Sequence, residues 1–164
     1  MRHIPKKKFG QNFLKDASII HSIIQSINPL PDDILIEIGP GLGALTKPLL
    51  EKCPHLLAIE LDRDIVSWME NEYPKKSITI FNEDVLNFNF HQFHQKVRIV
   101  GNLPYNISTP ILFKCIENIQ IVKDLHFMLQ KEVVDRMIAI PSSSEYGRLS
   151  VMLQYYFSME HLVH

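Results

Sequence analysis

In the stretch ILIEIGPGLG at residues 34–43, an apolar run passes directly into a glycine-rich turn. Four more short apolar runs follow along the chain and are typical of buried β-strands, with amphipathic stretches that predict helices between most of them. Neighbouring parallel strands need a crossover, which a helix supplies. The alternation therefore predicts an α/β domain with a doubly wound, mostly parallel sheet and helices on both faces.

The helix and strand signals also predict approximate boundaries. A first helix carries apolar residues from Ile19 to Ile27, with Asp16 placed to cap it. Pro48 lies inside the next helical stretch, so we expect that helix to begin near Thr46 or to bend there. Thr109 and Pro110 form a cap and first-turn pair. We expect strands over 34–39, 56–60, 78–82, 97–102 and 125–130, helices over 44–53, 62–72, 109–120 and 131–140, and an irregular segment over 83–96.

Length and composition indicate one compact domain of 164 residues, with 46% hydrophobic residues to build a core. The sequence has no apolar run of about 18 residues and no secretory signal, so we expect a cytoplasmic protein with no membrane contact. Cys53 and Cys115 lack metal spacing and are expected to be reduced core thiols. His91 and His94 have no third ligand, so no metal site is expected.

Charge is unevenly distributed, although the net charge is only −1. Five basic residues and no acidic residue fall within residues 2–15, namely Arg2, Lys6, Lys7, Lys8 and Lys15. Such a basic arm suits contact with phosphates, although its composition also fits a solvated tail.

Ligands of doubly wound sheets bind outside the carboxyl ends of the strands, so the residues after each strand are the first candidates. Gly39, Gly41 and Gly43 follow the first strand, and glycine allows a sharp turn and close approach of a ligand. Their G-x-G-x-G spacing differs from the G-x-G-x-x-G dinucleotide fingerprint, which argues against NAD and FAD. A tight turn without a ligand remains the alternative.

The next two strand ends indicate a nucleoside. Glu60 closes the second strand, 21 residues after Gly39, where a carboxylate can accept hydrogen bonds from both ribose hydroxyls. Asp84 follows the third strand and can accept from an adenine amine, while Val85 and Leu86 offer apolar surface to the ring. No phosphate-binding lysine or arginine accompanies them. These residues predict an adenosine without a pyrophosphate, and S-adenosylmethionine fits that description.

The fourth strand ends in GNLPYNIS at residues 101–108. The side-chain oxygen of Asn102 and the backbone carbonyl of Leu103 can accept hydrogen bonds from an adenine amine and free its lone pair for methylation. Pro104 would hold the loop, and Tyr105 would stack on a splayed-out base. The alternative is a proline turn that caps the following helix.

These motifs resemble those of the ribosomal-RNA adenine dimethyltransferases of the KsgA/RsmA type, relatives of the erythromycin-resistance methylases. The resemblance covers nearly the whole chain through KKKFGQNFL (6–14), EIGPGLGALT (37–46), AIELD (58–62), EDVL (83–86), GNLPYNIS (101–108), QKEVVDRM (130–137) and YGRLSV (146–151). It implies the Rossmann-like fold of S-adenosylmethionine-dependent methyltransferases. It also implies a cofactor site at Asn12, Leu14, Gly39, Glu60, Asp84 and Asn102, to which our reading of the strand ends adds Gly41 and Val85.

The resemblance further implies a domain organisation and a substrate. Residues 1–15 would be a lid over the cofactor, and residues 1–164 the methyltransferase domain. Family members continue with a final strand and a helical carboxyl-terminal RNA-recognition domain. We therefore expect a chain truncated before the last strand, with LSVMLQYYF at 149–157 as the sixth strand. The implied substrate is two adjacent adenines of small-subunit rRNA in an immature small ribosomal subunit.

Three functions compete on these observations. The first is an rRNA adenine N(6),N(6)-dimethyltransferase, which we expect to be a monomer. The second is a non-catalytic ribosome-assembly or nucleic-acid-binding factor on the same fold, against which the intact Asn102 and Tyr105 argue. The third is an NAD-dependent oxidoreductase, which the glycine spacing disfavours.

Overall fold

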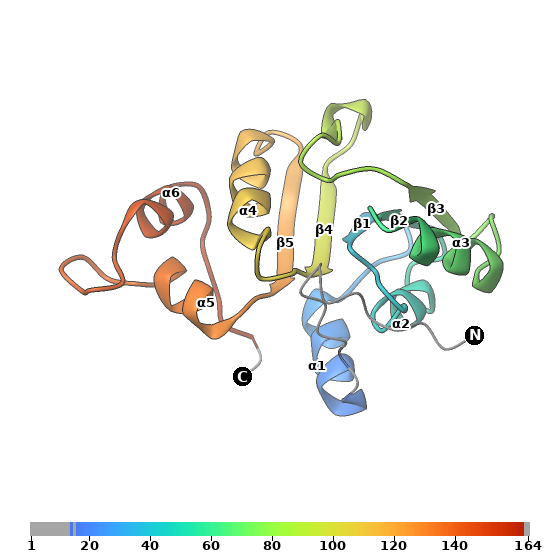
Figure 1. The fold of residues 1–164 in the computed structure, drawn as a ribbon, viewed down its shortest axis with the longest axis horizontal. Coiled ribbons are helices and arrows are strands. Elements are labelled where there is room, and N and C mark those ends of the chain that lie inside the picture. Colours follow the sequence, from blue (N-terminus) through green and yellow to red (C-terminus); the bar gives the residue numbers. More distant parts are fainter. Residues whose placement is uncertain (1–13, 15, 163–164) are drawn as a thin grey trace.

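A five-stranded, all-parallel sheet forms the centre of the molecule in the computed structural model, which describes residue 14 and residues 16–162 (Figure 1). The strand order is β3-β2-β1-β4-β5. The strands are β1 (Ile34–Ile38), β2 (Leu56–Ile59), β3 (Ile78–Phe81), β4 (Val97–Asn102) and β5 (Val122–Met128). The doubly wound parallel sheet predicted from the sequence is confirmed, and β5 begins three residues earlier than expected.

Helices connect and cover the strands. They are α1 (Ala17–Ile27), α2 (Thr46–Leu50), α3 (Arg63–Glu72), the short 3₁₀ helix η2 (Phe90–Gln92), α4 (Ser108–Glu117), α5 (Lys131–Met137) and α6 (Arg148–Tyr156). Asp16 caps α1 as predicted, because its side chain accepts hydrogen bonds from the backbone N–H groups of Ser18 and Ile19. The α2 helix begins at Thr46, which places Pro48 in its first turn, where a missing N–H costs little.

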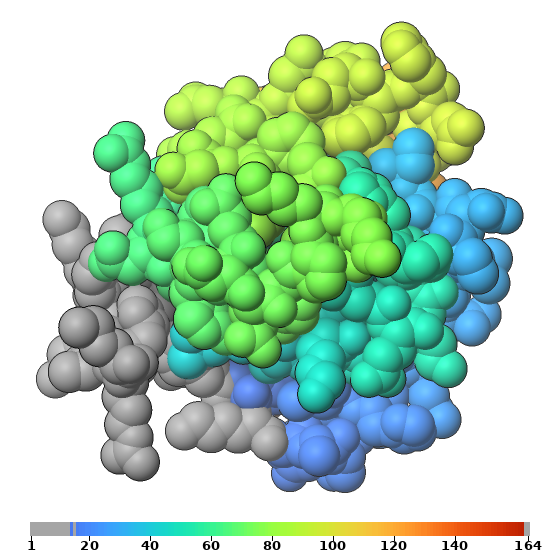
Figure 2. All heavy atoms as spheres, turned by 90° about the vertical axis from the view of Figure 1, so that its right-hand side faces the viewer, coloured from blue at the N-terminus to red at the C-terminus, as the bar shows by residue number. Residues whose placement is uncertain are grey.

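Alternate strand residues bury their side chains on opposite faces of the sheet. Leu35 packs on one face with apolar residues of α1, α2 and α3, whereas Ile36 packs on the other with α4 and residues 85–90. The space-filling view from the β3 side shows α3 and the segment that follows it forming much of that surface (Figure 2). Outside these two layers, α5 and α6 pack against α4 through Leu112, Val133 and Leu149.

A buried arginine ties α1 to the amino ends of the strands. Arg98 of β4 is 7% exposed and donates to Asp124 of β5 at 2.9 Å and to Asp33, just before β1, at 2.6 Å. Its remaining nitrogen donates to the backbone carbonyl of Ile27 at the end of α1, at 2.6 Å. This network lies opposite the strand ends that form the candidate site, so it supports the sheet without entering that site.

Two sequence expectations were wrong. Residues 149–156 lie in α6 and do not form a sixth strand, because Leu149 and Leu153, four residues apart, are buried on one face while Val151 and Tyr155 are exposed. Thr109 does not cap α4: the helix begins at Ser108, and Ile107 at the cap position makes no side-chain hydrogen bond.

Both cysteines lie in the core, as the sequence predicts. Cys53 and Cys115 are buried free thiols, and Lys131 pairs with Asp135 on an exposed face of α5. Within residues 14 and 16–162, no helix combines the length and apolarity needed to span a bilayer. In the same residues, no group of three potential ligands is placed to hold a metal ion.

Candidate functional site

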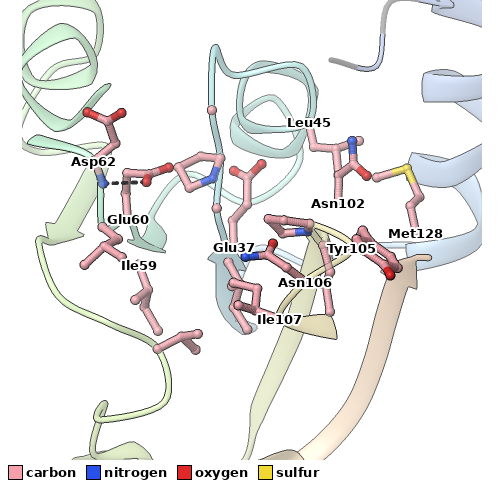
Figure 3. Close-up of a pocket in the computed structure, with 18 of the residues that line it drawn as sticks. Glu37, Leu45, Ile59, Glu60, Asp62, Asn102, Tyr105, Asn106, Ile107 and Met128 are labelled. Carbon is pink, nitrogen blue, oxygen red and sulfur yellow. Dashed lines mark hydrogen bonds between the residues drawn. The ribbon is translucent and has the colours of Figure 1, made fainter. Parts of the chain in front are cut away.

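A cavity of about 370 Å³ opens at the carboxyl ends of the strands, where the strand order reverses between β1 and β4. The turn after β1, the end of β2, residues 83–86, the loop after β4 and the end of β5 all line it (Figure 3). The predicted site residues that line it are Leu14, Gly39, Gly41, Glu60, Asp84, Val85, Asn102, Leu103, Pro104 and Tyr105. Asn12 lies outside the described residues. The structure therefore gathers every described residue of the predicted site in one place, and their roles stay predictions.

The glycine turn depends on backbone conformations that other residues rarely adopt. Gly39, Gly41 and Gly43 have φ angles of 63°, 55° and 78°. A Cβ atom at Gly39 would meet no atom within 4 Å, which leaves open space beside the turn. At Gly43 a Cβ atom would lie 2.5 Å from the hydroxyl oxygen of Tyr73, so this position also lacks room for a side chain. The turn therefore exposes its backbone to a ligand in the cavity.

Glu60 is buried, with 6% of its surface exposed, although an acidic residue at the end of a strand could equally be exposed to solvent. Its carboxylate accepts a hydrogen bond from the backbone N–H of Asp62 at 2.8 Å (Figure 3). Burial raises the pKa of Glu60, and hydrogen bonds from the backbone N–H groups of Asp62, Gly41 and Leu61 oppose that rise. These bonds hold the carboxylate at the cavity wall.

The segment after β3 presents a second acid beside an apolar surface. The carboxylate of Asp84 accepts a hydrogen bond from the backbone N–H of Leu86 at 2.9 Å, which fixes a local turn. Val85 is 5% exposed and packs with Phe88 and Phe90 in the core beneath the cavity. This arrangement provides a hydrogen-bond acceptor next to a flat apolar wall, as an adenine ring requires.

Backbone hydrogen bonds shape the loop after β4. The carbonyl of Pro104 accepts from the backbone N–H groups of Ile107 and Ser108, and the buried Ser108 hydroxyl donates to the Tyr105 carbonyl at 3.3 Å. The N–H of Leu103 donates to the carbonyl of Met128 at the end of β5. Tyr105 keeps 60% of its surface exposed, so its ring face is open to a partner.

Glu37 is a further residue of the cavity beyond those predicted from the sequence, and its side chain enters the cavity from the middle of the sheet. It is 2% exposed, and the Thr46 hydroxyl donates to its carboxylate at 2.6 Å. Burial raises the pKa of Glu37 from 4.5 to about 7, the Thr46 hydrogen bond opposes this rise, and the charge of Glu60 adds to it. The available signal was a charged residue inside the otherwise apolar run ILIEI.

The end of β5 also lines the cavity through Met128, Leu129 and Gln130. This strand is predicted from the sequence, but the predicted site residues all follow the four strands before it. Because the carboxyl ends of parallel strands meet at one edge, the same reasoning applied to the fifth strand would have found these residues.

The fold and this site together define the class: the domain has the Rossmann-like fold of S-adenosylmethionine-dependent methyltransferases. The family model described as "Ribosomal RNA adenine dimethylase" matches residues 2–164. This chain belongs to that family.

Similar proteins support the assignment. A protein of Methylobacillus flagellatus named ribosomal RNA small subunit methyltransferase A is 58% identical over 163 residues, which cover 99% of this chain and 64% of the relative. The chain thus spans just under two thirds of that relative. A dimethyladenosine transferase from Plasmodium falciparum superposes with a TM-score of 0.74 at 29% identity, covering 87% of this chain and 52% of that one. The 23S rRNA methyltransferase ErmE superposes with a TM-score of 0.66 at 26% identity, covering 76% of this chain and 50% of that one.

Proposed function

We propose that this chain binds S-adenosylmethionine in the cavity and carries the methyl-transfer site of an rRNA adenine N(6),N(6)-dimethyltransferase. Its substrate would be two adjacent adenines of small-subunit rRNA in an immature small ribosomal subunit, in the cytoplasm. The observation that carries the proposal is the meeting of the glycine turn, Glu60, Asp84 and the loop 102–105 around one cavity. The family and the names of the relatives support the choice of substrate.

Each group of residues along this edge of the sheet would contact a different part of the cofactor. Glu60 would accept hydrogen bonds from the ribose hydroxyls, and Asp84 with Val85 would hold the adenine ring. Gly39 and Gly41 would let the amino-acid part of the ligand approach the backbone. S-adenosylmethionine supplies an activated methyl group, so the protein mainly has to align the acceptor.

The loop after β4 would present the acceptor. The side-chain oxygen of Asn102 and the carbonyl oxygen of Leu103 would accept hydrogen bonds from the two hydrogens of an adenine amine, which leaves its lone pair free to attack. Pro104 would fix the loop, and the exposed ring of Tyr105 would stack on the extruded base. The amine proton can leave after the nitrogen becomes cationic, so no strong general base is needed.

The proposal extends to the amino-terminal segment and the oligomeric state. Residues 1–15 would act as a basic lid over the cofactor, with Asn12 and Leu14 in contact with it. Leu14 lines the cavity, which supports this role, and Asn12 lies outside the described residues. We propose a monomer as the working unit.

Two assays test this function. Isothermal titration calorimetry should detect binding of S-adenosylmethionine and none of NAD. Methyl-labelled S-adenosylmethionine should then transfer label to undermethylated small ribosomal subunits in preference to naked rRNA or DNA. Binding of NAD alone would contradict the cofactor assignment. Cofactor binding with tight RNA binding but no label transfer would favour a non-catalytic assembly factor.

A further inference from the structure

The candidate cavity is markedly acidic. Among the described residues that line it there is no lysine, arginine or histidine, whereas Glu37, Glu60, Asp62, Glu83 and Asp84 all contribute. A concave site lined by one sign of charge favours ligands of the opposite sign. The cavity is therefore suited to a ligand that carries a positive charge.

Glu37 differs from the other four acids in its position. It lies in β1, whose neighbours in the sheet are β2, followed by Glu60, and β4, which ends in Asn102. Figure 3 accordingly shows the Glu37 carboxylate between Glu60 on one side and Asn102 with Tyr105 on the other. This is the part of the cavity between the proposed ribose site and the loop that would present the acceptor base, where the sulfur of the cofactor would lie.

Thr46 holds this carboxylate. Its side chain is fully buried, and its hydroxyl donates to Oε2 of Glu37 at 2.6 Å. Glu37 precedes the glycine turn and Thr46 is the first residue of α2 after it, so the hydrogen bond links the two ends of the turn. A donated hydrogen bond stabilises the ionised form of a carboxyl group. Thr46 therefore both orients Glu37 and favours its negative charge.

We propose that the Glu37–Thr46 pair makes the cavity discriminate between the cationic sulfonium of the methyl donor and the neutral thioether that remains after transfer. Thr46 is a positioning residue in this inference, which rests on the cofactor site proposed above. S-adenosylmethionine and S-adenosylhomocysteine share the adenine, the ribose and the amino-acid groups. Contacts made by Glu60 and Asp84 therefore contribute nearly equally to both, and only a group that faces the sulfur changes the ratio of their affinities.

The ionisation of Glu37 falls within an accessible pH range, since burial raises its pKa to about 7. The titratable groups that interact with it are Glu60, at the end of β2, and Tyr73, which follows α3. Glu60 affects both ligands through the ribose, and burial raises the pKa of the Tyr73 hydroxyl above its usual value of 10, outside the tested range. Between pH 6 and 8 a change in the ratio of the two affinities therefore reports Glu37.

Calorimetry with the two ligands tests the inference on the wild-type chain, Glu37→Gln, Thr46→Val and Thr46→Ser. Thr79→Val is the matched control, because Thr79 lies on β3, its hydroxyl contacts His55 just before β2, and it does not line the cavity. At pH 8, Glu37→Gln should raise the Kd of S-adenosylmethionine relative to that of S-adenosylhomocysteine about tenfold, the scale of a partly screened charge interaction. Thr46→Val should shift the ratio in the same direction by about threefold, as the loss of one hydrogen bond implies, with Thr46→Ser near wild type.

Lowering the pH from 8 to 6 should shift the ratio in the wild-type chain in the same direction and leave it flat in Glu37→Gln. A wild-type chain that binds both ligands, with equal losses for both in every variant, would overturn this inference and leave the proposed cofactor site standing. Absence of binding in the wild type would overturn both. Glu37→Gln and the pH series decide the question even if Thr46→Val fails to fold.

Discussion

Glu60 and Tyr105 lie on the same cavity but would contact different molecules. Glu60 is buried beside the glycine turn, whereas Tyr105 is exposed on the loop after β4. Glu60→Ala should raise the Kd for S-adenosylmethionine about tenfold to a hundredfold, because it removes charge-assisted hydrogen bonds. Tyr105→Ala should leave that Kd nearly unchanged and lower methyl transfer by a similar factor, as the loss of about 1–3 kcal/mol of base stacking implies.

Calorimetry and single-turnover transfer measure the two effects separately. Equal loss of cofactor affinity in both variants would contradict this division of roles.

Glu37 should also affect stability, and the sign follows from its raised pKa. The folded state holds a proton on Glu37 up to about pH 7, whereas the unfolded chain releases it near pH 4.5. The free energy of unfolding should therefore fall as the pH rises from about 4.5 to about 7, by up to about 3 kcal/mol. In Glu37→Gln this part of the pH dependence should be absent.

Urea denaturation of both proteins at pH 5 and pH 7.5 measures the difference. If the free energy of unfolding changes equally between pH 5 and pH 7.5 in the wild type and in Glu37→Gln, then Glu37 is not protonated in the folded protein.

At the scale of single elements, Arg98 fastens α1 to the sheet. Its guanidinium group pairs with Asp33 and Asp124 and bonds to the carbonyl that ends α1. Arg98→Ala would leave the nearly buried Asp33 carboxylate without this partner, so the free energy of unfolding should fall by about 3–5 kcal/mol. The matched control is Lys131→Ala, which breaks an exposed pair with Asp135 and should cost less than about 1 kcal/mol.

Urea titrations of the two variants provide the measurement. Comparable losses in both would show that the buried network contributes no more than a surface ion pair.

The elements also show what sequence can and cannot predict here. The five strands and the residues after them were predictable, because buried parallel strands are short apolar runs and their ends meet at one edge. The expectation of a strand at 149–157 is wrong, because a short apolar run is compatible with either a strand or a helix. The burial of Leu149 and Leu153, four residues apart, identifies a helix. The hydrogen bond and the raised pKa of Glu37 were not predictable, since they depend on burial and on Thr46 and Glu60, which come close to Glu37 only in the folded protein.

Across the whole molecule, the central sheet and the outer helices should differ in how readily they unfold locally. β1 and β4 lie inside the sheet with neighbours on both sides, whereas α5 and α6 pack on α4 outside the two main cores (Figure 1). Amide hydrogen exchange should therefore be slowest in β1 and β4 and clearly faster in α5 and α6, which can open locally. Equal protection of both groups would show that the outer helices unfold only with the sheet.

The proposed methyl-transfer function requires the cofactor to bind in the cavity at the carboxyl ends of the strands. A crystal structure of this chain with S-adenosylhomocysteine tests this most directly. We predict the ribose hydroxyls on Glu60, the adenine beside Asp84 and Val85, and the sulfur between Glu37 and Asn102. A ligand bound elsewhere, or bound with its ribose away from Glu60, would contradict the proposed function.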